Sequence, residues 1–121
     1  MKKILIMDDE SSVQTLFTQY LESHGYVTAC CSNGVEGLEK LREFKADLVI
    51  VDIMMPEMDG LEVVQEIRKV NMELPIIAIS GGMRHAAINF VSFAQEFGAN
   101  AIFEKPVSLA DLLVSIKKLL D

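Results

Sequence analysis

Acidic side chains follow two short apolar segments of the sequence. Asp8 and Asp9 come directly after residues 4–7, and Asp52 comes directly after residues 48–51. Two carboxylates about 5 Å apart repel each other by roughly 3 kcal/mol at an effective dielectric of 20, so a group of them needs a cation or shifted pKa values. Hard oxygen ligands suit Mg²⁺, which keeps several waters and recruits phosphate oxygens. Beside such an ion, a carboxylate can act as a nucleophile toward phosphorus.

A hydroxyl and an ammonium group follow two further apolar segments. Ser80 ends the segment that begins at Pro75, and Lys105 follows residues 101–103. These two groups can hydrogen-bond and neutralise a transferred phosphoryl group. Each residue alone also has a structural interpretation, as a helix cap, a solvated loop residue or part of a turn. Their joint placement at the ends of apolar segments is what favours a functional site.

The apolar segments alternate with stretches of helical periodicity. The predicted strands cover residues 4–7, 26–30, 48–51, 75–79 and 101–103. The predicted helices carry apolar positions over residues 13–21, 35–41, 61–67, 90–97 and 109–120. Asn33 with Glu36, and Ser108 with Asp111, are typical of helix starts, and Asp59 opens the third helix.

Strands that are apolar on both faces must be covered on both sides. The alternation of strands and helices therefore predicts an α/β fold, a doubly wound sandwich around a parallel five-stranded sheet. Ligands bind such sheets beyond the carboxyl ends of the strands. The fold would then bring the acids, Ser80 and Lys105 to one edge of the sheet.

Length and composition favour one domain over residues 1–121. Half of the 121 residues are hydrophobic and 24% are charged, which is typical of a globular chain. The net charge of −7 disfavours nucleic-acid binding, and no apolar run approaches the roughly 20 residues of a membrane span. The adjacent Cys30 and Cys31 suit neither a distant disulfide nor a zinc site. We therefore expect packing cysteines and a cytoplasmic location.

The types and positions of these polar residues resemble those of the receiver domain of two-component response regulators. The resemblance covers the whole chain. It rests on the acid pair Asp8-Asp9, on Asp52 in the stretch 51–60, on Ser80 and on Lys105-Pro106. It implies a flavodoxin-like (βα)5 sandwich with strand order 2-1-3-4-5. It also implies a phosphorylation-activated signalling switch that dephosphorylates itself slowly and is not a turnover enzyme.

The resemblance implies roles for the acids. Asp52 accepts a phosphoryl group from a phosphohistidine of a sensor histidine kinase or a histidine phosphotransfer protein. Asp9, Asp52 and the backbone carbonyl of Met54 ligate Mg²⁺ directly, whereas Asp8 acts through a bound water.

It also implies roles for the remaining site residues. Lys105 pairs with the phosphoryl oxygens, and Ser80 hydrogen-bonds one of them and moves toward it. Pro106 makes the Lys-Pro bond cis, and Pro56 and Gly60 shape the loop after Asp52. Phosphorylation then changes the surface of the fourth helix, fifth strand and fifth helix, where a state-dependent partner or a second copy binds.

Two regions depart from the family pattern. Ile102 stands where the family usually has an aromatic residue, and Phe103 should face the other side of the sheet. We therefore expect a switch that works through Ser80 and the fourth helix without a ring flip.

Residues 81–100 form a long connection, in which Arg84 or His85 either modulates the phosphoryl lifetime or is simply solvated. The weakly charged outer face of residues 88–95 is either a docking surface or an ordinary solvated one.

Other functions remain as alternatives. A Mg²⁺-dependent phosphatase with an aspartyl nucleophile would, in the dehalogenase-like group, have a second Asp two residues after the first, which Asp8-Asp9-Glu10 lacks. A flavodoxin-like cofactor binder is nearly excluded, because Asp8 and Asp9 would repel the cofactor phosphate. A constitutive interaction module that keeps the fold is the third alternative. We expect no effector domain within these residues, which fit either a single-domain relay or the amino-terminal part of a longer regulator.

Overall fold

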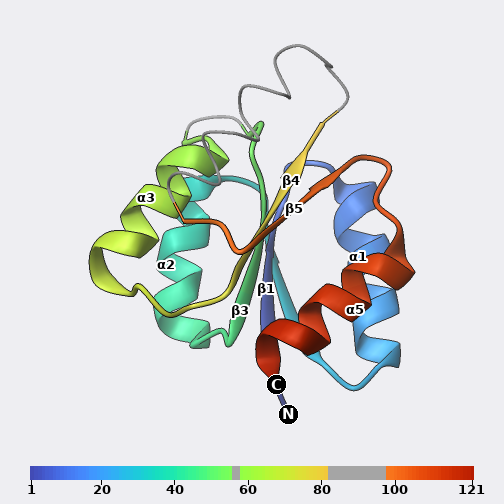
Figure 1. Cartoon of the computed structure of the whole chain (residues 1–121). Coiled ribbons are helices and arrows are strands. Elements are labelled where there is room, and N and C mark those ends of the chain that lie inside the picture. Colours follow the sequence, from blue (N-terminus) through green and yellow to red (C-terminus); the bar gives the residue numbers. More distant parts are fainter. Residues whose placement is uncertain (56–57, 82–97) are drawn as a thin grey trace.

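The computed structural model describes residues 1–55, 58–81 and 98–121 (Figure 1). The strands within these ranges are β1 (Lys3–Met7), β2 (Val27–Cys31), β3 (Leu48–Asp52), β4 (Ile76–Ser80) and β5 (Ala101–Glu104). The helices are α1 (Ser11–Ser23), α2 (Gly34–Phe44), α3 (Gly60–Val70) and α5 (Leu109–Leu120). The helix predicted over residues 90–97 lies outside the described residues, as do Pro56, Arg84 and His85.

The five strands form one parallel sheet in the order β2-β1-β3-β4-β5, which confirms the predicted fold and strand order. Helices α1 and α5 cover one face of the sheet, and α2 and α3 cover the other (Figure 1). The register pairs Asp52 of β3 with Ile79 of β4, and Ser80 of β4 with Glu104 of β5. The carboxyl ends of these neighbouring strands therefore lie at one edge of the sheet.

Alternating side chains of the strands divide the core into two clusters. The cluster beneath α2 and α3 contains Leu5, Met7, Val49, Val51, Val63, Val64 and Ile67. The cluster beneath α1 and α5 contains Ile4, Ile6, Ile50, Phe17, Leu21, Leu112 and Ile116. In β5, Ile102 packs against the first cluster and Phe103 against the second, so the two side chains point to opposite faces, as predicted.

The strand bounds differ from the prediction by one residue at several ends. The predicted apolar segments stop one residue before Asp52, Ser80 and Glu104, and in the structure these three residues pair in the ladder with neighbouring strands. Backbone pairing extends each strand past its apolar residues, because hydrogen bonds of the main chain do not depend on side-chain polarity. The polar residues at this edge therefore have the fixed backbone of a sheet.

Three helices begin with the side-chain caps that the sequence indicates. Their cap residues each accept a hydrogen bond from a backbone N–H three positions later: Asn33 from Glu36 at 2.9 Å, Asp59 from Glu62 at 3.0 Å and Ser108 from Asp111 at 3.3 Å. Each cap satisfies one of the N–H groups left unpaired at a helix start. The caps fix where α2, α3 and α5 leave the sheet.

Helix α1 begins differently. Its cap residue is Glu10, whose side chain makes no capping hydrogen bond. Asp8 accepts a hydrogen bond from the backbone N–H of Glu10 at 2.8 Å but does not cap the helix, so the interpretation of Asp8 or Asp9 as a simple cap is wrong. Both acidic side chains, Asp8 and Glu10, are thereby available to other groups.

The two cysteines lie in β2 as packing side chains, as the sequence predicts. Cys30 and Cys31 are free thiols; Cys31 is buried and Cys30 is half-buried beside the hydroxyl of Thr18. Among the helices described, none combines the length and the apolar character that crossing a membrane requires.

Candidate functional site

One lysine lies among three carboxylates at the carboxyl edge of the sheet. The Nζ atom of Lys105 is 2.7 Å from Glu10 Oε1, 3.1 Å from Asp52 Oδ2 and 3.2 Å from Asp8 Oδ2. Asp8 and Glu10 follow β1, Asp52 ends β3 and Lys105 follows β5, so three separate strands contribute to the site. One ammonium group cannot neutralise three carboxylates, so the described residues of the site carry an excess of negative charge.

Both carboxylate oxygens of Asp52 have protein partners. Oδ1 accepts a hydrogen bond from the backbone N–H of Met54 at 3.0 Å, and Oδ2 accepts one from Lys105 at 3.1 Å. The residue is only 2% exposed. Burial, and then the charge of Asp8, raise the pKa of Asp52 to about 6, although Met54 and Lys105 oppose this shift. At neutral pH most molecules therefore carry an ionised Asp52 that is held in one orientation.

Asp8 has one oxygen available for a further partner. Oδ1 accepts the hydrogen bond from Glu10, whereas Oδ2 is buried and has no hydrogen-bond partner in the described part of the chain. Its 3.2 Å approach to Lys105 is an ion-pair distance without hydrogen-bond geometry. Burial raises the pKa of Asp8. A buried carboxylate oxygen without a hydrogen bond is costly, and a cation at this position would offset that cost.

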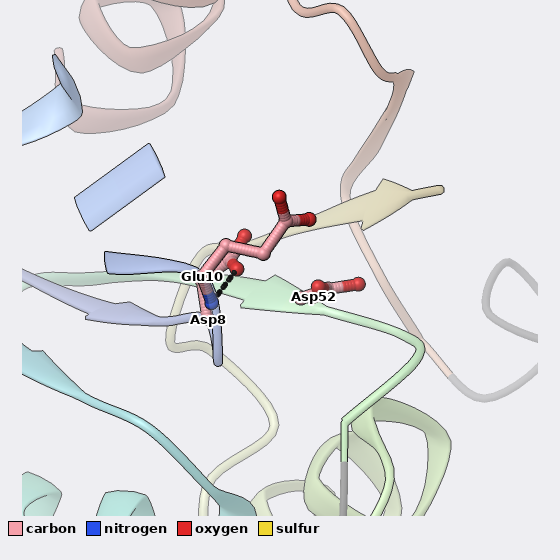
Figure 2. A group of neighbouring side chains, drawn as sticks. All are labelled: Asp8, Glu10 and Asp52. Atoms are coloured by element: carbon pink, nitrogen blue, oxygen red, sulfur yellow. Dashed lines mark hydrogen bonds between the residues drawn. The ribbon is translucent and has the colours of Figure 1, made fainter. Parts of the chain in front are cut away.

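The carboxylates are close enough to share a metal ion. One oxygen each of Asp8, Glu10 and Asp52 lies within 4.8 Å of the others (Figure 2). An all-oxygen donor set that carries several negative charges, one of whose oxygens accepts no hydrogen bond from the described residues, fits Mg²⁺. The group differs from the predicted ligand set, because Asp9 is exposed and does not belong to this cluster, whereas Glu10 does.

Sequence reasoning gave Glu10 no role of its own. The sequence held one signal, because Glu10 follows Asp8 by two positions; the structure shows that its backbone is extended, with φ −91° and ψ 115°. In extended backbone, side chains two residues apart point to the same side. The same rule places the side chain of Asp9 on the other side.

Lys105 stays protonated at this site. Burial lowers the pKa of Lys105, but the hydrogen bond to Glu10 and the charges of Asp52 and Asp8 outweigh it, and the pKa ends above its ordinary value. The backbone N–H of Lys105 donates a hydrogen bond to the carbonyl of Ser80 at 2.8 Å, and the following Lys105–Pro106 peptide bond is cis. The main chain of Lys105 is thus tied to the end of β4.

Ser80 lies at the same edge with a weakly bound hydroxyl. It is the last residue of β4 and follows Ile79, the partner of Asp52 in the ladder. The residue is 1% exposed, and its hydroxyl donates to the carbonyl of Gly81 at 3.4 Å. Because this bond is long, the hydroxyl loses little when it takes a better acceptor.

Gly60 brings the loop after Asp52 back against the strand. Its N–H donates to the carbonyl of Ile53 at 2.9 Å. A Cβ on Gly60 would lie 2.6 Å from the Cα of Ile53 and would also collide with the carbonyl of Asp52. Only glycine fits there, so Gly60 shapes the backbone that follows Asp52.

Comparisons with known proteins agree with this geometry. The family described as "Response regulator receiver domain" matches residues 4–117. A crystal structure of a CheY-like receiver domain protein from Methanospirillum hungatei superimposes with a TM-score of 0.92 at 33% identity, and covers 100% of this chain and 94% of that one.

Two curated relatives are similar over nearly the whole chain. The alkaline phosphatase synthesis transcriptional regulatory protein PhoP of Bacillus subtilis is 34% identical over 98% of this chain and 48% of its own length. The sensor kinase CckA of Brucella abortus is 34% identical over 98% of this chain and 12% of its own length. The chain thus spans about half the length of PhoP and a small part of CckA. By its sequence, its fold and the arrangement of its strand ends, the chain belongs to the family of response regulator receiver domains, which are signalling domains.

Proposed function

We propose that the chain, over residues 1–121, is a single receiver domain in which Asp52 accepts a phosphoryl group. The observation that carries the proposal is the fixed, ionised carboxylate of Asp52 beside Lys105, next to an oxygen of Asp8 that has no hydrogen-bond partner among the described residues. In the transfer, an oxygen of Asp52 forms a bond to phosphorus and the bond between phosphorus and the donor imidazole nitrogen breaks. The released imidazole keeps the electron pair of that bond and takes up a proton.

The carboxylates supply the place for Mg²⁺. Following the family resemblance, we assign Asp52, Asp9 and the backbone carbonyl of Met54 as direct ligands, with Asp8 acting through a water; the side chain of Asp9, which lies outside the carboxylate cluster of the structure, would have to turn toward the ion. When bound, the ion lowers the repulsion between the carboxylates and the incoming phosphoryl oxygens. The buried position of Asp8 and Asp52 supports this assignment, because their charges are poorly screened by solvent.

Lys105 and Ser80 bind the oxygens of the new phosphoryl group. A phosphoryl group adds about −1.5 to −2 charges and three strong acceptors. Lys105 pairs with one of its oxygens, and the weakly bound hydroxyl of Ser80 turns to another. Since Ile102 replaces the usual aromatic residue, the signal passes through Ser80 to the surface that includes β5 and α5, and no ring flip is required.

The partners follow from this chemistry. A histidine kinase or a histidine phosphotransfer protein supplies the phosphoryl group; the similarity to a region of the sensor kinase CckA is in keeping with such a pathway. A state-dependent protein partner or a second copy of the chain reads the output surface. The net charge of −7 disfavours nucleic acid as a ligand of this chain, and we place it in the cytoplasm.

Labelling with a small phosphoryl donor tests the proposal. Acetyl phosphate with Mg²⁺ should add one phosphoryl group per chain, observed by intact mass, and Asp52→Asn should remain unlabelled. Labelling of Asp52→Asn to the same extent would contradict the role of Asp52. Hydrolysis of a generic phosphate ester far beyond one turnover per chain would instead favour a Mg²⁺-dependent phosphatase.

A further inference from the structure

The shortest ion pair at the site joins Lys105 to a residue outside the assigned ligand set. Lys105 Nζ is 2.7 Å from Glu10 Oε1, closer than to Asp52 or Asp8 at 3.1 and 3.2 Å. The Glu10 side chain is 55% exposed, whereas those of Asp8 and Asp52 are 2% and 3% exposed. The lysine is therefore held between two buried carboxylates and one at the rim of the site.

The backbone of Glu10 is fixed while its carboxylate is free to reach the lysine. Its N–H is bound by Asp8 at 2.8 Å, and its carbonyl accepts the N–H groups of Val13 and Gln14 at 3.1 Å each. These bonds anchor Glu10 at the start of α1. A cap residue commonly uses its side chain to bind the helix N–H groups, but the side chain of Glu10 makes no such bond and pairs with Lys105 instead.

We propose that Glu10 is a positioning residue that holds Lys105 at the rim of the unphosphorylated site and competes with the phosphoryl group for it. The proposal rests on the proposed function of Asp52. A phosphoryl group offers three oxygens to the one ammonium group of Lys105. Among the described carboxylates around Lys105, the one of Glu10 is the most exposed to solvent, so screening weakens its ion pair with the lysine most. This ion pair therefore breaks before the other two when a phosphoryl group is added.

Beryllofluoride, which mimics a phosphoryl group on a carboxylate, measures this competition at equilibrium. At saturating Mg²⁺, Glu10→Gln should bind beryllofluoride about two- to fivefold more tightly than the wild-type chain by ¹⁹F NMR titration, as expected for removal of a partly exposed ion pair. Glu39→Gln, the same change at an exposed position of α2, is the matched control and should leave the affinity unchanged.

The same Glu10 change in a variant that lacks Lys105 distinguishes positioning of the lysine from charge repulsion and from metal binding by Glu10. In Lys105→Met, the change Glu10→Gln should leave beryllofluoride affinity unchanged, because no lysine remains to be held. An equal gain in both backgrounds would show simple charge repulsion between Glu10 and the anion, and would overturn the proposal. If the effect of Glu10→Gln on beryllofluoride affinity disappears at saturating Mg²⁺, Glu10 is a metal ligand. That result would also overturn the proposal.

A double-mutant cycle on unfolding checks the contact without metal or phosphoryl group. Glu10→Gln and Lys105→Met should be coupled by about a two- to fivefold factor in the unfolding constant, and a coupling factor of one would refute the contact. If the wild-type chain takes no label from acetyl phosphate, the proposed function of Asp52 itself fails. Labelling of Asp52 with unchanged beryllofluoride affinity in Glu10→Gln overturns only the role of Glu10.

Discussion

Lys105 Nζ lies 3.1 Å from Asp52 Oδ2, although the two residues are 53 positions apart in the chain. The contact depends on β3, β4 and β5 being neighbours in a parallel sheet, which aligns the ends that carry the two residues. It places a permanent cation beside a buried carboxylate whose pKa is raised to about 6.

Asp52 should make the stability of the chain depend on pH. Its pKa is raised from 3.8 in the unfolded chain to about 6 in the folded one, mainly by burial. The folded state therefore binds more protons between these values, and this residue's contribution to stability falls as pH rises through that window. Asp52→Asn should raise the free energy of unfolding at pH 7.5 by about 1–3 kcal/mol.

The same substitution should have little effect at pH 4, where the folded wild-type carboxyl is protonated. Urea unfolding of both proteins at the two pH values measures the difference. A stabilisation of Asp52→Asn that is equal at pH 4 and pH 7.5 would show that it does not come from the ionisation of Asp52.

Mg²⁺ should stabilise the folded chain. Binding to the folded state alone adds about 2.7 kcal/mol when the free ion is one hundred times its dissociation constant. Thermal unfolding should shift upward with Mg²⁺ in the wild-type chain and much less in Asp52→Asn, which removes a charged ligand. Ca²⁺, Na⁺ and a chelator are the comparisons. An equal shift with Na⁺ at matched ionic strength would indicate screening of the carboxylates and no specific site.

Gly60 should tolerate no side chain. Because the Cβ of Gly60→Ala would meet the backbone of Ile53 at 2.6 Å, the loop or the strand end must move. We expect a loss of about 1–3 kcal/mol in unfolding free energy together with slower phosphoryl acceptance. Gly81→Ala is the folding control, since a Cβ there has no atom of the described residues within 4 Å. Equal stability of the two variants would contradict the close approach of Gly60.

Ser80 should matter for the response more than for stability. The hydroxyl of Ser80 makes one long hydrogen bond of 3.4 Å, so Ser80→Ala should change the unfolding free energy by less than about 0.5 kcal/mol. In the proposed switch, it should reduce the beryllofluoride-induced changes in backbone amide NMR shifts across β5 and α5. Full changes in Ser80→Ala would remove this residue from the signalling route.

Arg68 should be a structural anchor. Its Nε and Nη2 donate to the carbonyl of Gly98 at 3.1 and 2.8 Å, and further bonds reach Asn100 and Asn71. Arg68→Lys cannot reproduce this planar set of donors and should destabilise the chain by about 1–2 kcal/mol in urea unfolding. The neighbouring Lys69→Gln, on an exposed i,i+3 pair with Glu66, should cost less than about 0.5 kcal/mol.

Local patterns in the sequence were enough to predict the fold. The strands are short apolar runs, and caps such as Asn33 and Ser108 act over three residues, so neither requires knowledge of distant contacts. Opposite faces for Ile102 and Phe103 follow from strand alternation in the same way. The strand order came partly from the family resemblance.

Side-chain partners at the site were harder to predict. The pairing of Glu10 with Lys105 depends on the rotamers of two long side chains 95 positions apart, and the family pattern drew attention to Asp9 instead. The hydrogen bonds of Arg68 to Gly98 and Asn100 likewise depend on where α3 packs against the residues before β5. Such contacts leave no periodic signal in the sequence.

A crystal structure of the chain with Mg²⁺ and beryllofluoride is the decisive test of Asp52 as the phosphoryl acceptor. We expect beryllofluoride bonded to a carboxylate oxygen of Asp52, one Mg²⁺ beside it among the carboxylates, and Lys105 Nζ turned toward a fluorine. Beryllofluoride bound elsewhere, or Asp8 and Asp52 turned apart with no ion between them, would contradict it.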